Sequence, residues 1–124
     1  MSNIYEKVIA VVGVSEREQK FGYKIFRDLI KHNFNVIGIN PRGGQILGRK
    51  IYKDLRDVGS LPDLVITVVA PQITEKIVEV CAKVGIREIW MQPGSESDTA
   101  IEKAKKYGIA VTHNACFMLQ HGIW

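Results

Sequence analysis

The chain has 124 residues, 46% of them hydrophobic and 24% charged, which is the composition of a globular protein with a single core. No apolar run approaches the roughly 20 residues of a membrane-spanning helix, and the first residues lack the apolar centre of a secretory signal, so we expect a cytoplasmic protein with no membrane partner. The 17 basic and 13 acidic side chains leave a net charge of +4, which favours an anionic ligand. Because the basic residues are dispersed and no RNA-binding aromatic motif is present, a polyanionic cofactor is favoured over a nucleic acid.

The first predicted element is a buried strand at Val8–Val12, an unbroken apolar and mostly β-branched run that Gly13 ends. An amphipathic helix is expected at residues 22–32. A strand that feeds a glycine turn and then a helix N-terminus is suited to phosphate, because free backbone N–H groups and the positive end of the helix dipole face the turn. A plain strand-to-helix turn capped by Ser15 is the structural alternative.

Strand and helix patterns alternate along the rest of the chain. The second strand ends in a turn-rich cluster, where Pro41 holds Asn40 extended. Pro71 suits the first turn of the next helix, and Gly85 suits its end. The buried face expected for that helix consists of Ile73, Ile77, Val80, Cys81 and Val84. The further predicted elements are strands at residues 34–39, 49–52, 63–70, 86–92 and 109–112, a helix capped by Ser95 or Ser97, a helical turn within 53–58, and a turn or short helix within 113–124.

Strands that alternate with helices of about 10–14 residues predict an α/β fold with a parallel sheet. We expect a single domain over residues 1–124, a Rossmann-like doubly wound sheet with strand order 3-2-1-4-5, right-handed crossovers and helices on both faces. In such a fold the ligand lies at the carboxyl ends of strands 1 and 4, where the winding reverses.

The turn after the first strand departs from the dinucleotide fingerprint, which needs glycines at its first, third and sixth positions. Only Gly13 is present, and the loop to Gly22 is longer and more polar. The second strand ends in Asn40, where an NAD-binding protein normally has a carboxylate for the ribose diol, and Arg42 follows it. A cation there favours a ligand with a phosphate on that ribose, which means NADP or coenzyme A (CoA). The P-loop pattern is missing, so ATP hydrolysis has no support.

Six segments occur in the order VVGVS (residues 11–15), KFG (20–22), INPRGG (39–44), VVAP (68–71), WMQPG (90–94) and NAC (114–116). In these segments the chain resembles the small standalone CoA-binding proteins, and it is similar to the CoA-binding domain of the succinyl-CoA synthetase alpha subunit. Synthetases of that kind carry a further domain with a phosphorylated histidine, which nothing here is long enough to supply. We therefore do not expect the synthetase activity to carry over.

The resemblance also implies which segment binds which part of the ligand. The turn after the first strand would hold the CoA pyrophosphate, the end of the second strand the 3′-phosphate and adenosine, and the later strand ends the pantetheine arm. The implied residues are Gly13, Val14, Ser15 and Lys20 for the pyrophosphate, Arg42 for the 3′-phosphate, Asn40 and Pro41 for the adenosine, Ala70 and Pro71 for the middle of the ligand, and Gln92, Pro93 and Gly94 for the pantetheine, with Phe21 as a further binding residue.

No catalytic or metal site is expected. Cys81 and Cys116 form no CxxC pattern, and the three histidines lie in separate segments without carboxylates at triad or metal spacing. Cys116 follows the last predicted strand, so it can lie near the thiol of a bound CoA. A mixed disulfide between Cys116 and CoA is therefore a hypothesis, and a partly buried thiol in a turn is its alternative.

The expected function is binding of CoA or an acyl-CoA by a non-catalytic carrier, sensor or CoA-presenting module. Two alternatives stay open. One is the CoA-binding component of a split acyl-CoA synthetase, whose partner chain would hold the other catalytic parts. The other is an NAD(P)-binding redox sensor, since Arg42 argues against NAD and leaves NADP open. The expected partner is a small-molecule ligand, with a protein partner or a homodimer as further options.

Overall fold

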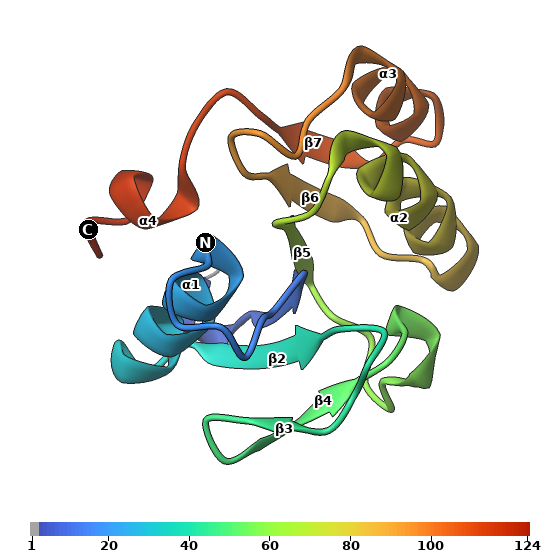
Figure 1. Ribbon diagram of the computed structural model, residues 1–124. Helices are drawn as coiled ribbons and strands as arrows, with labels where there is room; N and C mark the ends of the chain where they lie inside the picture. The colour runs from blue at the N-terminus through green and yellow to red at the C-terminus, as the bar shows by residue number, and fades with distance from the viewer. Residues whose placement is uncertain (1–2) are drawn as a thin grey trace.

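The computed structural model describes residues 3–124, in which one sheet of seven strands separates two layers of α-helices (Figure 1). The strands are β1 (Val8–Val12), β2 (Asn35–Ile39), β3 (Gln45–Ile46), β4 (Arg49–Tyr52), β5 (Leu64–Thr67), β6 (Glu88–Met91) and β7 (Ala110–Thr112). The helices are α1 (Phe21–Lys31), α2 (Pro71–Val84), α3 (Asp98–Lys106) and α4 (Phe117–Gln120), with short 3₁₀ turns at Ile4–Glu6 and Leu55–Asp57.

The sheet order is β3-β4-β2-β1-β5-β6-β7, and every pairing is parallel except that of β3 with β4. The α/β, Rossmann-like class is confirmed. The central strands follow the predicted order 3-2-1-4-5 when β4 is counted third, but the sheet continues beyond it at both edges. β7 adds a parallel strand at one edge, and the two-residue β3 adds an antiparallel strand at the other.

The antiparallel pair of β3 and β4 is joined by a tight turn whose residue types do not predict a turn. Leu47 and Gly48 join β3 to β4 with φ angles of 55° and 74°. Two successive residues with positive φ are typical of the tight hairpin turn that matches strand twist, but the first is normally Asn, Asp or Gly. Because leucine is not typical of this turn position, the sequence did not predict a hairpin here, and the expected strand order omitted β3.

Each face of the sheet has its own apolar core. One core lies under α1 and α4, where Phe26 and Phe117 are fully buried against Val11. The other lies under α2 and α3, where Val78 and Ala104 are fully buried. β1 contributes alternate side chains to both cores, as expected of a strand covered on both faces. Figure 1 shows α1 and α4 on one side of the sheet and α2 with α3 on the other.

Several helix ends match their predicted signals. Pro71 begins α2, Gly85 ends it in the left-handed conformation, and the Ser97 side chain caps α3 by accepting a hydrogen bond from Ala100 N. The predicted buried face of α2 is partly wrong. Thr74 and Val78 join Cys81 as its fully buried residues, whereas Ile73 is 42% exposed. The prediction placed the larger aliphatic residues at the centre of the buried face, but the helix packs on the sheet through a face that includes the buried Thr74.

Candidate functional site

Three adjoining cavities follow the carboxyl ends of the central strands, where β1 and β5 feed helices on opposite faces of the sheet. The cationic cavity measures about 340 Å³ and is lined by Ser15, Glu16, Arg17, Lys20, Asn40, Arg42, Gly43, Gly44, Gln45 and Ile46. The central cavity measures about 400 Å³ and is lined by Gly13, Val14, Ser15, Lys20, Phe21, Gly22, Asn40, Val68 and Val69. The apolar cavity measures about 170 Å³ and is lined by Phe21, Ile25, Val68, Gln92, Pro93, Cys116 and Trp124.

Shared walls join the three cavities into one trough. Ser15, Lys20 and Asn40 line both the cationic and the central cavity. Phe21 and Val68 line both the central and the apolar cavity. The trough therefore runs across the point where the winding of the sheet reverses, which is where open α/β sheets bind their ligands.

Two glycines bring the first helix close to the sheet. Gly13 has a φ of 108°, and a Cβ there would lie 2.2 Å from the carbonyl oxygen of Val68. A Cβ on Gly22 would lie 2.0 Å from the carbonyl oxygen of Gly13. Only residues without a Cβ allow this approach. Gly13 and Gly22 thus have the roles of the first and last glycines of the dinucleotide fingerprint, but the loop between them is longer.

The backbone donors of this turn differ from those that the sequence suggests. The amides of Gly13 and Val14 both donate to the carbonyl of Ile39, at 3.0 and 3.3 Å, so they serve the sheet. Within residues 3–124, the amides of Ser15, Phe21 and Gly22 have no hydrogen-bond acceptor. All three residues line the central cavity. The phosphate-binding capacity of the turn thus lies at Ser15 and at the first residues of α1.

Asn40 holds two loops together at the end of β2. Its side-chain amide donates to the carbonyl of Val14, and its Oδ1 accepts from the backbone N–H of Arg42 at 2.8 Å. The second bond is an Asx-turn, which directs the chain toward Gly43 and Gly44. Asn40 therefore shapes the junction between the cationic and central cavities.

The charged side chains of the trough are gathered at one end. Arg17, Lys20 and Arg42 line the cationic cavity together with one carboxylate, Glu16. The opposite end is lined by aromatic, aliphatic and proline side chains around Cys116. A ligand that matches this gradient is anionic at one end and uncharged at the other.

Gln92 organises the apolar end. It is 5% exposed, and its Oε1 accepts a 2.7 Å hydrogen bond from the backbone N–H of Phe117, the first residue of α4. Its Nε2 donates to the Cys116 sulfur at 3.3 Å. The carboxamide thus joins the end of β6 to the start of α4 and holds Cys116 at the cavity wall.

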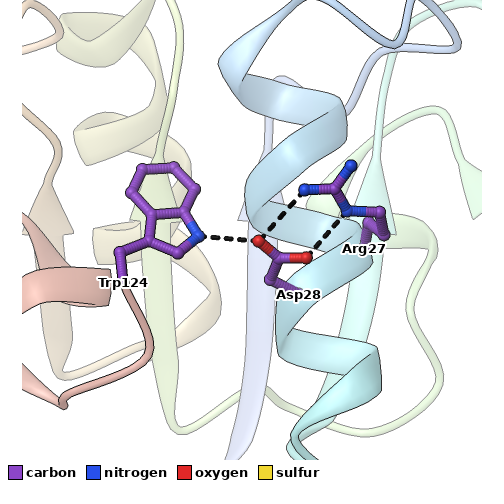
Figure 2. A network of polar contacts seen from close by, with 3 residues as sticks. All are labelled: Arg27, Asp28 and Trp124. Atoms are coloured by element: carbon purple, nitrogen blue, oxygen red, sulfur yellow. Dashed lines mark hydrogen bonds and ion pairs between the residues drawn. The ribbon is translucent and has the colours of Figure 1, made fainter.

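Trp124 lines the apolar cavity, and Figure 2 shows how Asp28 on α1 holds its indole. The indole N–H donates to Asp28 Oδ2 at 2.7 Å, and the Arg27 guanidinium bonds both oxygens of the same carboxylate. The pKa of Asp28 is lowered from its ordinary value, first by the bond from Arg27 and then by that from Trp124. The carboxylate is therefore charged at neutral pH and keeps its two donors.

Most of the predicted site residues lie in the trough. Those that line it are Gly13, Val14, Ser15, Lys20, Phe21, Asn40, Arg42, Gln92, Pro93 and Cys116. The linings of these three cavities do not include Pro41, Ala70, Pro71 or Gly94. Ala70 and Pro71 form the start of α2, and the Gly94 amide donates to Glu96 in a turn beside the trough.

Sequence reasoning missed a second group of lining residues. Gly22, Gly43, Gly44, Val68 and Val69 lie inside the matched segments, so their position was a usable signal. Arg17, Ile25 and Trp124 carry no local signal, because they join the trough only through folding.

Within residues 3–124 there is no cluster of metal-ligating side chains, and no helix is long and apolar enough to cross a membrane.

The family model described as a CoA binding domain matches residues 7–122. The chain belongs to this family. The expected resemblance is thereby confirmed. This CoA binding domain is 37% identical over 83 residues to an ADP-forming acetate–CoA ligase of Methanocaldococcus jannaschii, an alignment that covers 67% of the chain and 12% of the ligase. It is 26% identical over 121 residues to the uncharacterized protein YneT of Bacillus subtilis, covering 94% of the chain and 87% of that protein.

Solved structures agree with these relatives. A conserved hypothetical protein of Pyrococcus furiosus has a TM-score of 0.88 and 30% sequence identity, covering 92% of this CoA binding domain and 98% of that chain. The chain spans 12%, 18% and 26% of the length of the first acetate–CoA ligases that it matches. The relation to those ligases therefore concerns one of their domains.

Proposed function

We propose that this domain binds CoA or an acyl-CoA along the trough at the carboxyl edge of its sheet. The observation that carries the proposal is the gradient within that trough, from three cations at one end to an apolar cavity at the other. CoA has the same polarity, with phosphates at its nucleotide end and an uncharged pantetheine arm that ends in a thiol. Membership of the CoA binding domain family supports the same ligand.

In this proposal the phosphates take the donors that the protein leaves free. The amides of Ser15, Phe21 and Gly22, with Lys20, face the pyrophosphate, and the N-terminus of α1 adds its dipole. Arg42 meets the 3′-phosphate beside Asn40. The pantetheine arm passes Val68 toward Gln92, Pro93 and Cys116. Pro41, Ala70, Pro71 and Gly94 flank this path and take part through the loops that they shape.

The role that we propose is a non-catalytic one in the cytoplasm: a carrier, a sensor, or a module that presents CoA to another protein. A trough open to solvent along its length suits a ligand that is taken up and handed on. The chemistry of the lining residues supports binding of the coenzyme.

Isothermal titration with CoA, dephospho-CoA, NADP, NAD and ATP tests the ligand class. We expect CoA to bind best and dephospho-CoA about 10- to 100-fold more weakly, because dephospho-CoA lacks the 3′-phosphate and with it a charge-assisted bond to Arg42 worth about 1.5–3 kcal/mol. Arg42→Ala should bind CoA and dephospho-CoA equally. Arg87→Ala, which removes the same charge beside the amino end of β6, is the matched control and should retain the difference.

Three results would contradict the proposal, in whole or in part. If NADP or NAD binds better than CoA, the redox-sensor alternative replaces it. If wild-type protein binds CoA and dephospho-CoA with equal affinity, Arg42 is not in the site, although the trough can still hold the rest of the coenzyme. If no CoA binding is measurable at neutral pH and low salt, the proposed function is wrong.

A second candidate is the CoA-binding component of a split acyl-CoA ligase. The observation that favours it is a relative named subunit alpha of an ADP-forming acetate–CoA ligase from Pyrococcus furiosus, 26% identical over 121 residues that cover 85% of this chain. Affinity purification from the native source distinguishes the two candidates. A partner that restores acyl-CoA formation from acid, CoA and nucleotide supports the ligase component, and a chain recovered with CoA alone supports the carrier.

A further inference from the structure

The apolar cavity has a size and a boundary that bear on which acyl groups fit, an inference that rests on the proposed function. Its volume is about 170 Å³, and its walls are Phe21, Ile25, Val68 and Pro93 with Gln92, Cys116 and Trp124. An apolar protein cavity of about 150 Å³ holds a benzene molecule, which has six carbon atoms. The cavity therefore has room for about six or seven heavy atoms.

That volume divides between the coenzyme and its cargo. The CoA sulfur and the carbon bonded to it take about two of these positions, which leaves about five for the acyl group, enough for four carbons and the carbonyl oxygen. Short acyl groups would fill the cavity, and longer chains would meet its walls, one of which is the ring of Trp124.

Trp124 is fixed from two directions. On one side its indole N–H bonds Asp28, and its ring lies 6.2 Å from the ring of Phe21 between centroids. Phe21, Ile25 and Asp28 are spaced four and three residues apart, so they lie along one face of α1. On the other side the backbone N–H of Trp124 donates to the carbonyl of Met118 in α4, at 3.2 Å.

The carboxylate that holds the indole is itself immobilised. Arg27 Nε bonds Asp28 Oδ1 at 2.7 Å, and Arg27 Nη2 bonds Oδ2, which also accepts the indole N–H. Asp28 thus has one orientation for both donors, and the indole follows it. We infer that Trp124, positioned by Asp28, limits the acyl group of a bound thioester to about four carbons, so that the domain selects short-chain acyl-CoA.

Titration with CoA and with acetyl-, butyryl-, hexanoyl- and octanoyl-CoA tests this inference. In wild-type protein the affinity should rise about fourfold per methylene up to butyryl and then level or fall, because further carbons have no apolar surface to bury. In Trp124→Ala the rise should continue, so that octanoyl-CoA gains about tenfold or more relative to butyryl-CoA. Asp28→Ala should shift the limit in the same direction by less, and Trp124→Phe, which keeps a ring but also lacks the N–H that bonds Asp28, should shift it by a similar small amount.

The control is Tyr107→Ala, which removes another half-exposed aromatic side chain, from the end of α3, and should leave the chain-length profile unchanged. A merely structural role for Trp124 would weaken all five ligands alike and leave the break at butyryl. If wild-type protein shows no break, or if the break stays in both Trp124→Ala and Asp28→Ala, the inference is wrong while CoA binding stands. If CoA itself fails to bind, the proposed function fails and the inference with it.

Discussion

Two cysteines of this chain lie in opposite surroundings. Cys81 is fully buried on the face of α2 that packs against the sheet, and burial raises the pKa of its thiol to about 12. Cys116 is partly exposed at the wall of the apolar cavity, beside the Gln92 side chain. At physiological pH the Cys81 thiol is therefore protonated in the folded protein, and because the thiolate is the reactive form, Cys81 is inert.

The first prediction concerns oxidised CoA. Incubation with CoA disulfide at pH 8 should add one CoA to Cys116 and none to Cys81. The Cys116 thiolate attacks one sulfur of the disulfide, the S–S bond breaks, and the second CoA leaves as its thiolate. Intact-mass spectrometry should show the adduct, and dithiothreitol should remove it. The hypothesis of a mixed disulfide at Cys116 is wrong if Cys116→Ser is modified to the same extent as the wild type.

Among the elements, α1 is placed by a contact that its sequence pattern does not show. Gly22 is the second residue of the helix, and its position lies directly against the carbonyl of Gly13. In most helices alanine is favoured over glycine by about 1 kcal/mol. Here the close approach of backbone to backbone reverses that preference, because a side chain would push the helix away from the turn.

The second prediction follows from this contact. Gly22→Ala should lower the free energy of unfolding by about 2 kcal/mol, since overpacking against fixed backbone costs more than helix propensity returns. Urea denaturation measures the change. Gly59→Ala is the matched control, because a Cβ at Gly59 meets no atom within 4 Å, and it should be neutral or slightly stabilising. An equal gain in stability for both variants would show that α1 does not depend on the Gly13 contact.

Over the whole molecule, the trough collects segments from both halves of the chain. Arg42 comes from the loop after β2, Phe21 from α1, Gln92 from the end of β6 and Trp124 from the segment after α4. No single element forms the trough, so it exists only in the folded state. A ligand that binds there must therefore stabilise the fold as a whole.

The third prediction is a concentration-dependent rise in melting temperature. CoA at a free concentration of 100 times its Kd should stabilise the domain by about 2.7 kcal/mol. For a domain of this size that corresponds to a shift on the order of 10 °C. Differential scanning fluorimetry measures it, with Arg42→Ala at the same CoA concentration as the control that should shift less. A shift that does not grow with CoA concentration would argue against binding to the native state.

Much of the fold is readable from local pattern. Val8–Val12 is apolar throughout, so only a strand covered on both faces suits it, and Pro71 with Gly85 marks the two ends of α2. The hairpin of β3 and β4 was not readable as such, because Leu47 adopts a positive φ that leucine rarely takes. Its conformation follows from the pairing of the two strands and not from the residue's own preference.

The sequence pattern alone was enough to predict the class of fold and the edge of the sheet at which the trough lies, because buried strands and glycine turns are recognisable from neighbouring residues. It could not give the free donors of the turn, since Ile39 occupies the amides of Gly13 and Val14 from another strand. Nor could it give the wall of the apolar cavity, because Trp124 meets Asp28 across 96 residues of chain. Contacts at such separation depend on the packed molecule, and no short stretch of residues encodes them.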